Sequence, residues 1–190
     1  FECFKPNKDL IIDILKQAVP SGLSMGLVGL GVFILIYVVS TYGDYSAGGY
    51  GTAVRFEQLF LLPILGLNTA TLSLVGQNLG AGNLERIKEI YFTTLKYGVG
   101  LMIIGGLIIF ISSTHVMSFF SDDHEIIYYG TLYLKVAAFA GPCYPIFYIT
   151  SALLQGMKKP SYALIINLLR MIIFPLIILG PAVVVYQISY

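Results

Sequence analysis

The stretch Thr52–Arg86, TAVRFEQLFLLPILGLNTATLSLVGQNLGAGNLER, decides the fold. It begins with an apolar run, and a helix that crosses a bilayer needs roughly 20 mostly apolar residues. The run ends in a polar loop that contains Gly80 and Gly82, which can stop a helix, and Asn83, which can cap the next one. The stretch therefore predicts a transmembrane helix, a tight return and the start of a second helix.

The whole chain repeats this pattern. It has 190 residues, of which 57% are hydrophobic and 11% are charged, whereas soluble domains carry about 25% charged residues. Five runs are long enough to span a bilayer: Ala18–Tyr42, Thr52–Gln77, Tyr91–Ser118, Tyr128–Gly156 and Pro160–Gln187. A soluble chain of this size cannot bury five such runs. We predict an all-α membrane protein with five transmembrane helices.

The basic residues predict the orientation. The leader, two of the four connections and their flanks hold Lys5, Lys8, Lys16, Arg86, Lys88, Lys96, Lys158 and Lys159. The connections 43–50 and 119–127 hold neither lysine nor arginine. Because cytoplasmic loops are enriched in basic residues, we predict a cytoplasmic N-terminus, an external 119–127 turn and insertion in the cell (inner or plasma) membrane.

Residues 1–17 differ in pattern from residues 18–190, which hold the spans. Asn7 can cap a helix after Pro6, and apolar residues then form a stripe on one face, Leu10, Ile11, Ile14 and Leu15. This segment is either an interfacial helix on the inner leaflet or a cytoplasmic extension of the first span. The chain begins FECFKPNKDL, without a Met or a signal peptide, and we expect a piece of a larger protein.

The glycine-rich loop is not a phosphate-binding loop. No Lys-Ser/Thr pair follows the glycines, and their spacing fits neither a P-loop nor a dinucleotide fingerprint. We interpret it as a return between two spans. Gly76 and Gly80 form a small-xxx-small pair that would let a neighbouring helix approach closely.

Apart from Lys96 and His115, which lie towards the two ends of the third span, four ionisable residues fall within the spans: Arg55, Glu57, Lys135 and Arg170. Charges there are costly, so each is a functional candidate. At 1.5 Å per residue, Glu57 and Lys135 lie about 9 and 10 Å from the outer ends of their spans, and Arg170 lies about 15 Å from the inner face. Glu57 can pair with Lys135, with Arg55 as a competitor, or bind a coupling ion or substrate. Structural pairing or snorkelling is the alternative for each residue.

Other polar and aromatic residues are candidates for lining a cavity. The polar ones are Gln58, Asn68, Thr69, Thr71, Gln155 and Asn167. Such residues also join helices or satisfy backbone groups. Tyr144 and Tyr148 lie deep enough to stack on a cationic drug. An interfacial belt accounts for the tyrosines at the outer ends of the spans, Tyr42, Tyr45, Tyr50, Tyr128, Tyr129 and Tyr133.

Prolines within the spans predict bends, and each bend is either a hinge or fixed. These prolines are Pro63, Pro142, Pro145 and Pro175. His115 and His124 have no partners at a spacing that suits a metal site or catalysis. We therefore expect no catalytic residues, no metal, no cofactor and no nucleic-acid partner.

The segment Tyr50–Ile87 resembles one helix and its following loop in the multidrug and toxic compound extrusion (MATE) family. The hallmark loop of that family matches Gly76, Gln77, Asn78, Gly80, Ala81, Gly82, Asn83 and Arg86. Weaker signatures follow the same order, with PSGLSMGL at Pro20–Leu27, YG at Tyr42–Gly43 and LLQGMKKPSYALIINLLR at Leu153–Arg170. The resemblance implies twelve helices in two lobes of six. This chain is similar to the C-terminal lobe without its last helix, and its partner would be the missing N-terminal lobe.

The resemblance implies a secondary antiporter in the lipid bilayer, not an enzyme. It would export small organic molecules, often cationic or amphipathic, in exchange for H⁺ or Na⁺ by alternating access. Some members carry carboxylates on the first and fourth helices of this lobe, but residues 18–42 and 128–156 contain no Asp or Glu. Glu57 is the one carboxylate within the predicted spans.

Three other functions compete with the antiporter. A flippase for lipid-linked oligosaccharides or polysaccharides, from the same multidrug/oligosaccharide-lipid/polysaccharide superfamily, would need a more cationic cavity, to which Lys135 and Arg170 could contribute. An intramembrane enzyme would need a nucleophile and base, or metal ligands, at one depth. A scaffold without transport activity is the remaining alternative.

Overall fold

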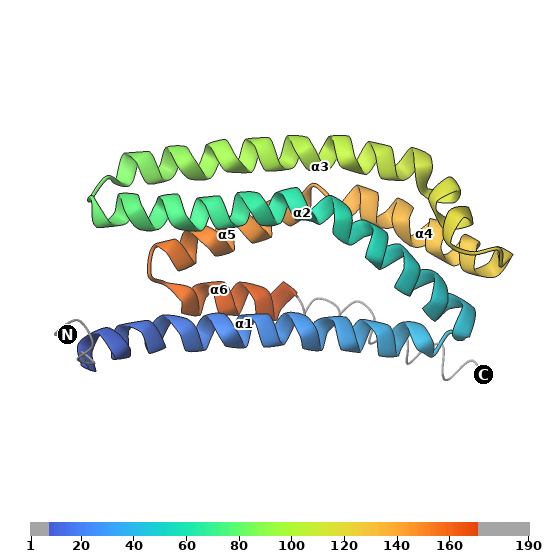
Figure 1. The fold of residues 1–190 in the computed structure, drawn as a ribbon, viewed down its shortest axis with the longest axis horizontal. Coiled ribbons are helices and arrows are strands. Elements are labelled where there is room, and N and C mark those ends of the chain that lie inside the picture. The colour runs from blue at the N-terminus through green and yellow to red at the C-terminus, as the bar shows by residue number, and fades with distance from the viewer. Residues whose placement is uncertain (1–7, 171–190) are drawn as a thin grey trace, which may run out of the picture.

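The computed structural model describes residues 8–170, which form six helices (Figure 1). They are α1 (Lys8–Ser40), α2 (Asp44–Gly80), α3 (Leu84–Phe120), α4 (His124–Ala140), α5 (Cys143–Gly156) and α6 (Pro160–Leu168). All five connections are short, so consecutive helices run back and forth, except that α4 and α5 follow each other across a break. The predicted all-α fold is confirmed.

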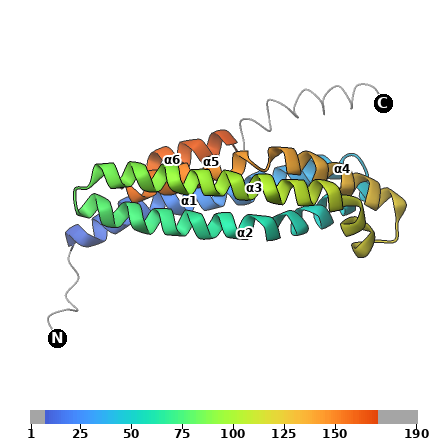
Figure 2. The ribbon, with the colours of Figure 1, turned by 90° about the horizontal axis from the view of Figure 1, so that it is seen from above.

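The helices form two layers. α2, α3, α4 and α5 pack against one another, whereas α1 packs mainly on α6. Figure 1 shows α1 and α6 side by side on one face of the other four helices, and Figure 2 shows the same bundle from above. The two layers also contact each other, through α5 with α6 and through α1 with α2.

Three of the predicted spans correspond to single helices, since α1, α2 and α3 are each long and apolar enough to cross a membrane. The predicted fourth span is a pair of helices, α4 and α5, bent by 55°. The break includes Gly141 and Pro142, so the bend predicted at Pro142 is confirmed. The structure thus contains three candidate spans, or four if the bent pair is one. The predicted fifth span begins with α6, and the rest of it, with Pro175, lies outside the described residues.

The N-terminal segment and the first span form one helix. α1 runs without a break from Lys8 to Ser40 and passes through Pro20. No turn separates residues 8–17 from the span, which is the geometry of an extension rather than of a separate interfacial helix. The predicted cap, Asn7, lies outside the described residues.

The connections that hold basic residues share one end of the bundle. Figure 1 shows the start of α1, the α2–α3 loop and the α5–α6 loop at that end, and the α1–α2 and α3–α4 turns at the opposite end. The basic residues predicted to be cytoplasmic, as far as they are described, therefore belong to the connections of one end or to the helices that start there. The side of the membrane on which this end lies remains a prediction.

Close helix contacts occur at glycines other than the predicted pair. A Cβ atom at Gly49 of α2 would lie 2.8 Å from the backbone nitrogen of Gly130 in α4, and one at Gly106 of α3 would lie 2.7 Å from the Ala138 carbonyl oxygen. In contrast, nothing lies within 4 Å of a Cβ built at Gly76 or Gly80. Within residues 8–170 the predicted close approach does not occur at that pair, because both glycines lie on the exposed side of α2.

The glycine-rich loop has the predicted structural form. Gly82 has a φ of 71°, in the left-handed region that glycine adopts readily. The Asn83 side chain accepts a hydrogen bond of 3.1 Å from the Arg86 backbone N–H and caps α3. Arg86 also pairs with Glu89 at 2.7 Å on the surface.

Candidate functional site

The centre of the site is Glu57, in the first half of α2. Glu57 is buried, with only 6% of its surface exposed. Its Oε2 accepts a 2.7 Å hydrogen bond from the Tyr133 hydroxyl, and its Oε1 accepts a 2.8 Å hydrogen bond from the Tyr144 hydroxyl. Each carboxylate oxygen thus has its own donor, which offsets part of the cost of burying the charge.

The two tyrosines come from the two halves of the bent helix pair. Tyr133 belongs to α4 and Tyr144 to α5, on opposite sides of the 55° bend. Glu57 therefore joins three helices at one point. Tyr50, seven residues before Glu57 on α2, packs edge-on against the Tyr133 ring, with centroids 5.0 Å apart.

Beside this point lies a cation packed against three aromatic rings. The guanidinium carbon of Arg170 lies 5.0 Å from the ring centroid of Tyr144, 5.1 Å from that of Phe147 and 4.9 Å from that of Tyr148. All three distances fall within the range of cation–π interactions. The rings occupy positions i, i+3 and i+4 of α5, which lie on one helix face. We call Tyr144, Phe147 and Tyr148 the α5 aromatic cage.

Hydrogen bonds from neighbouring helices hold α5 in place. The Asn68 side-chain amide of α2 donates to the Tyr148 backbone carbonyl at 2.6 Å. The hydroxyls of Tyr91 in α3 and Thr150 in α5 lie 3.0 Å apart. Asn68, predicted to line a cavity or to join helices, thus joins two helices next to the cage.

The predicted ion pair between Glu57 and Lys135 is wrong. Lys135 lies two residues after Tyr133, and two residues turn a helix by about 200°. Its side chain therefore points away from Glu57, and its Nζ lies 5.9 Å from the centroid of Phe110 in α3. Within residues 8–170 neither Glu57 nor Lys135 makes an ion pair. The depth of a residue along a helix does not specify the helix face on which its side chain lies.

The same rotation separates Arg55 from Glu57 on α2. Arg55 is exposed and lines an open surface pocket with Thr52, Phe56, Leu59 and Phe120. Gln58 is exposed as well, whereas Asn167 of α6 is half-buried. These three residues take no part in the network around Glu57 as far as the structure describes it.

Two predicted cavity residues satisfy their own helix backbone instead. The Thr71 hydroxyl donates to the Leu67 carbonyl at 2.7 Å, and that of Thr69 donates to the Gly66 carbonyl at 2.9 Å. In the hallmark loop, the Asn78 side chain likewise donates to a backbone carbonyl of its own helix, that of Leu74, at 2.8 Å. The loop lies at the end of α2 that is farther from Glu57.

The sequence-based interpretation missed Tyr133 and Tyr50, which it assigned to an interfacial belt. Tyr133 donates to a buried carboxylate, so the belt assignment is wrong for it. A signal was present: Tyr133 and Tyr144 are eleven residues apart, which is about three helical turns and places both on one face. The predicted stacking of Tyr144 and Tyr148 on a cation does occur, but the cation is Arg170.

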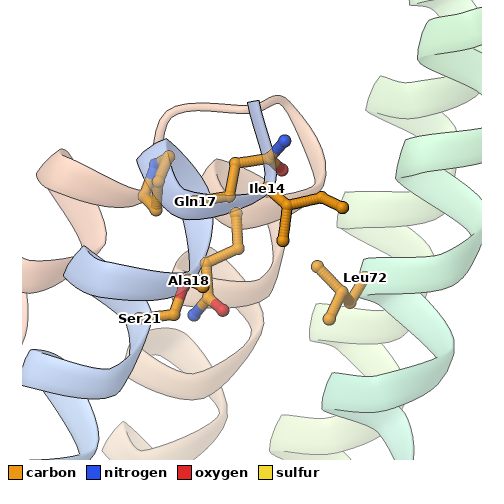
Figure 3. A pocket seen from close by; sticks show the side chains of 7 residues that line it. Ile14, Gln17, Ala18, Ser21 and Leu72 are labelled. Atoms are coloured by element: carbon orange, nitrogen blue, oxygen red, sulfur yellow. The ribbon is translucent and has the colours of Figure 1, made fainter. Parts of the chain in front are cut away.

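Apart from the site around Glu57, a hollow lies between the two layers, near the basic end. It has a volume of about 360 Å³ and is lined by Ile14, Gln17, Ala18, Ser21, Leu72, Gln155 and Pro160. Figure 3 shows Ile14 of α1 and Leu72 of α2 on opposite sides of this hollow. Leu72 lies fifteen residues beyond Glu57, or roughly 22 Å along α2. This hollow is therefore distinct from the site around Glu57.

Comparison with known proteins identifies similar transporters. Residues 20–179 match the family model described as MatE. The chain is 27% identical over 156 residues to the probable multidrug resistance protein YpnP of Bacillus subtilis (strain 168), covering 82% of this chain and 35% of that protein. It is 27% identical over 153 residues to the multidrug export protein MepA of Staphylococcus aureus (strain MSSA476), covering 80% of this chain and 31% of MepA.

A solved structure shares the fold. It is described as the outward-facing conformation of a multidrug resistance MATE family transporter of the MOP superfamily. The TM-score is 0.84 at 26% identity, over 90% of this chain and 38% of the other. The chain thus spans about a third of the length of the curated relatives it matches.

Among residues 8–170, no three His, Cys, Asp or Glu side chains gather so that they could hold a metal ion.

Proposed function

Because the chain belongs to the MatE family of transporters, which are not enzymes, we propose that it forms part of a secondary active efflux transporter. In this proposal the transporter exports organic, often cationic or amphipathic, compounds and imports H⁺ or Na⁺ by alternating access. This chain would supply one lobe, similar to the C-terminal lobe of the family, and the other lobe would complete the cavity.

The observation that carries the proposal is the buried Glu57 carboxylate with its two tyrosine donors. An ionisable group inside a membrane helix is costly and is a candidate for ion coupling. Glu57 also bonds to both halves of a bent helix pair. A change in its charge therefore acts at once on α2, α4 and α5, which coupling between an ion and a conformational change requires.

The hydrogen-bond pattern favours H⁺ over Na⁺ as the coupling ion. In this arrangement two hydroxyl hydrogens point at the carboxylate, whereas Na⁺ needs oxygen lone pairs directed at it. A proton needs no further ligand. On protonation, one carboxyl oxygen becomes a donor and a poorer acceptor, so one of the two tyrosine hydrogen bonds weakens or reverses. Proton binding therefore loosens either α4 or α5 from α2.

The arrangement of cations favours an exporter of organic compounds over a flippase for lipid-linked saccharides. A pyrophosphate would be bound best by several cations facing one cavity. Lys135 lies against Phe110 of α3, whereas Arg170 lies against α5. The two cations contact different helices and share no aromatic or ionic partner in the described structure.

The test is ion-driven efflux from membrane vesicles that hold the transporter expressed from its native reading frame. Ethidium efflux is measured under an imposed proton gradient and, separately, under a sodium gradient. We expect a proton gradient to drive efflux, Glu57→Gln to abolish it, and Glu89→Gln, which alters an exposed carboxylate of α3, to leave it unchanged. Efflux driven by a sodium gradient alone would mean that the coupling ion is Na⁺ and not H⁺. Normal efflux in Glu57→Gln under both gradients would exclude Glu57 as the coupling site.

A further inference from the structure

We propose that the α5 aromatic cage is a binding site for an organic cation, and that Arg170 occupies it in this structure as an internal substitute for the substrate. The inference rests on the proposed function and names the position at which the exported cation binds. It also makes Arg170 an intramolecular competitor of that cation.

The cage is built to bind a cation. Three ring centroids lie between 4.9 and 5.1 Å from one guanidinium carbon. Elsewhere in the described structure, Lys135 has a single ring at 5.9 Å. Several aromatic rings around one positive charge are the arrangement that recognises ligand cations such as quaternary ammonium groups.

The cage does not depend on Arg170 for its shape. The Tyr144 hydroxyl is bound to Glu57 at 2.8 Å, and the backbone at Tyr148 is bound to Asn68 at 2.6 Å. Two residues further, Thr150 is in contact with Tyr91. All of these partners belong to α2 and α3, in the same layer as α5. The α5 backbone and the Tyr144 ring are therefore held without the guanidinium.

Arg170 can leave without stranding an opposite charge. Within residues 8–170 it makes no ion pair, and the contacts described for its guanidinium are with the three rings. It lies two residues beyond the end of α6, which packs with α1 in the other layer. The cage and its occupant therefore belong to elements of different layers, and a shift between the layers would let another cation take the place of Arg170.

Glu57 increases the affinity of the cage for cations. Its carboxylate accepts the Tyr144 hydrogen bond, and this draws electron density towards the ring that faces the cation. The negative charge of Glu57 also attracts the cation, since the Tyr144 side chain contacts both of them. When Glu57 takes up a proton, both effects weaken. A proton on Glu57 and an organic cation in the cage thus oppose each other, which is the relation that an antiporter needs.

The experiment measures ethidium binding to the purified transporter by fluorescence polarisation, beside a thermal melt of each variant. We expect Arg170→Gln to tighten ethidium binding at least about threefold, because the internal competitor is removed, and Phe147→Leu to weaken it by a similar factor, because one ring is lost. The Arg170→Gln/Phe147→Leu double variant should lose the gain. Phe110→Leu is the matched control, since it removes the ring beside Lys135, and should bind as the unaltered protein does.

Unchanged or weaker ethidium binding in a folded Arg170→Gln variant would overturn the proposal. Should that variant not fold, Arg170→Met, which keeps the length of the side chain without its charge, is subject to the same criterion. A second arm measures the binding of farnesyl pyrophosphate. If the unaltered protein binds it and Arg170→Gln does not, Arg170 binds an anion, which would also overturn the cage. Ion-driven efflux in the unaltered protein tests the proposed function separately. If that efflux occurs but the Arg170 and Phe147 variants bind ethidium as the unaltered protein does, the cage is refuted and the proposed function is not.

Discussion

Glu57 and Tyr144 are 87 residues apart in the sequence, and the Tyr144 hydroxyl donates to the Glu57 carboxylate at 2.8 Å. The ring of the same tyrosine lies 5.0 Å from the guanidinium carbon of Arg170. One aromatic side chain therefore contacts both an anion, through its hydroxyl, and a cation, through its face. Opposite charges within the helices are thus connected without a direct ion pair, which leaves each of them free to exchange its partner.

The first prediction concerns the two donors to Glu57. Tyr133→Phe and Tyr144→Phe each leave one carboxylate oxygen without its donor, which costs about 1–3 kcal/mol. We expect each variant to lower the melting temperature in detergent. In the Glu57→Gln background the same substitutions should cost less, because the buried charge is gone. Equal losses in both backgrounds would show that the tyrosines stabilise the fold independently of Glu57. Tyr128→Phe, at an exposed tyrosine of α4, is the control.

The second prediction follows from the position of Lys135. Because its ammonium group faces Phe110 rather than Glu57, Lys135→Gln should leave efflux intact and should not rescue Glu57→Gln. The check is ethidium efflux from vesicles for the two single variants and the double variant. Partial recovery of efflux or of the melting temperature in the double variant would instead show that Glu57 and Lys135 form an ion pair.

The third prediction concerns close helix packing. Gly49→Ala would place a methyl group 2.8 Å from the backbone of α4, and overpacking of this kind costs typically about 1–3 kcal/mol. Gly76→Ala, on the same helix, meets nothing within 4 Å and should be neutral or slightly stabilising, since alanine favours helix over glycine. Thermal melts of the two variants side by side test the assignment. A larger loss in Gly76→Ala than in Gly49→Ala would contradict it.

The fourth prediction is the orientation in the membrane. In a variant with Cys3 and Cys143 replaced by serine, a cysteine at Asp123 should react with an impermeant maleimide on intact cells. A cysteine at Asn83 should react only after the membrane is opened, because its loop lies among the basic residues. Labelling at Asn83 but not at Asp123 in intact cells would reverse the topology.

The fifth prediction is that this chain alone does not transport. It spans about a third of the length of its curated relatives, and a single lobe leaves its cavity face without the partner lobe. Reconstituted alone in vesicles, the chain should show no ion-driven efflux of ethidium. Coupled efflux from the isolated chain at monomeric dilution would refute the half-transporter interpretation.

The sequence by itself determined the kind of protein and its elements. Apolar runs of bilayer length predict helices, because the backbone must satisfy its hydrogen bonds internally in lipid. Gly82 and Asn83 predicted the turn after α2, and Pro142 predicted the bend between α4 and α5. These features depend on composition and on neighbours in the chain, so local rules were sufficient. The same rules singled out Glu57, since a buried charge is costly whatever surrounds it.

Only the tertiary structure decided which partners Glu57 and Arg170 have. Depth along a helix follows from counting residues, but the face of a side chain depends on how each helix is rotated against its neighbours. A two-residue step turns a helix by about 200°, and it separates Lys135, beside Phe110, from Tyr133, beside Glu57. The contact of Arg170 with the α5 aromatic cage likewise depends on how α6 packs against α5. Rotation is fixed by the packing of several helices at once, and no local pattern in the chain specifies it.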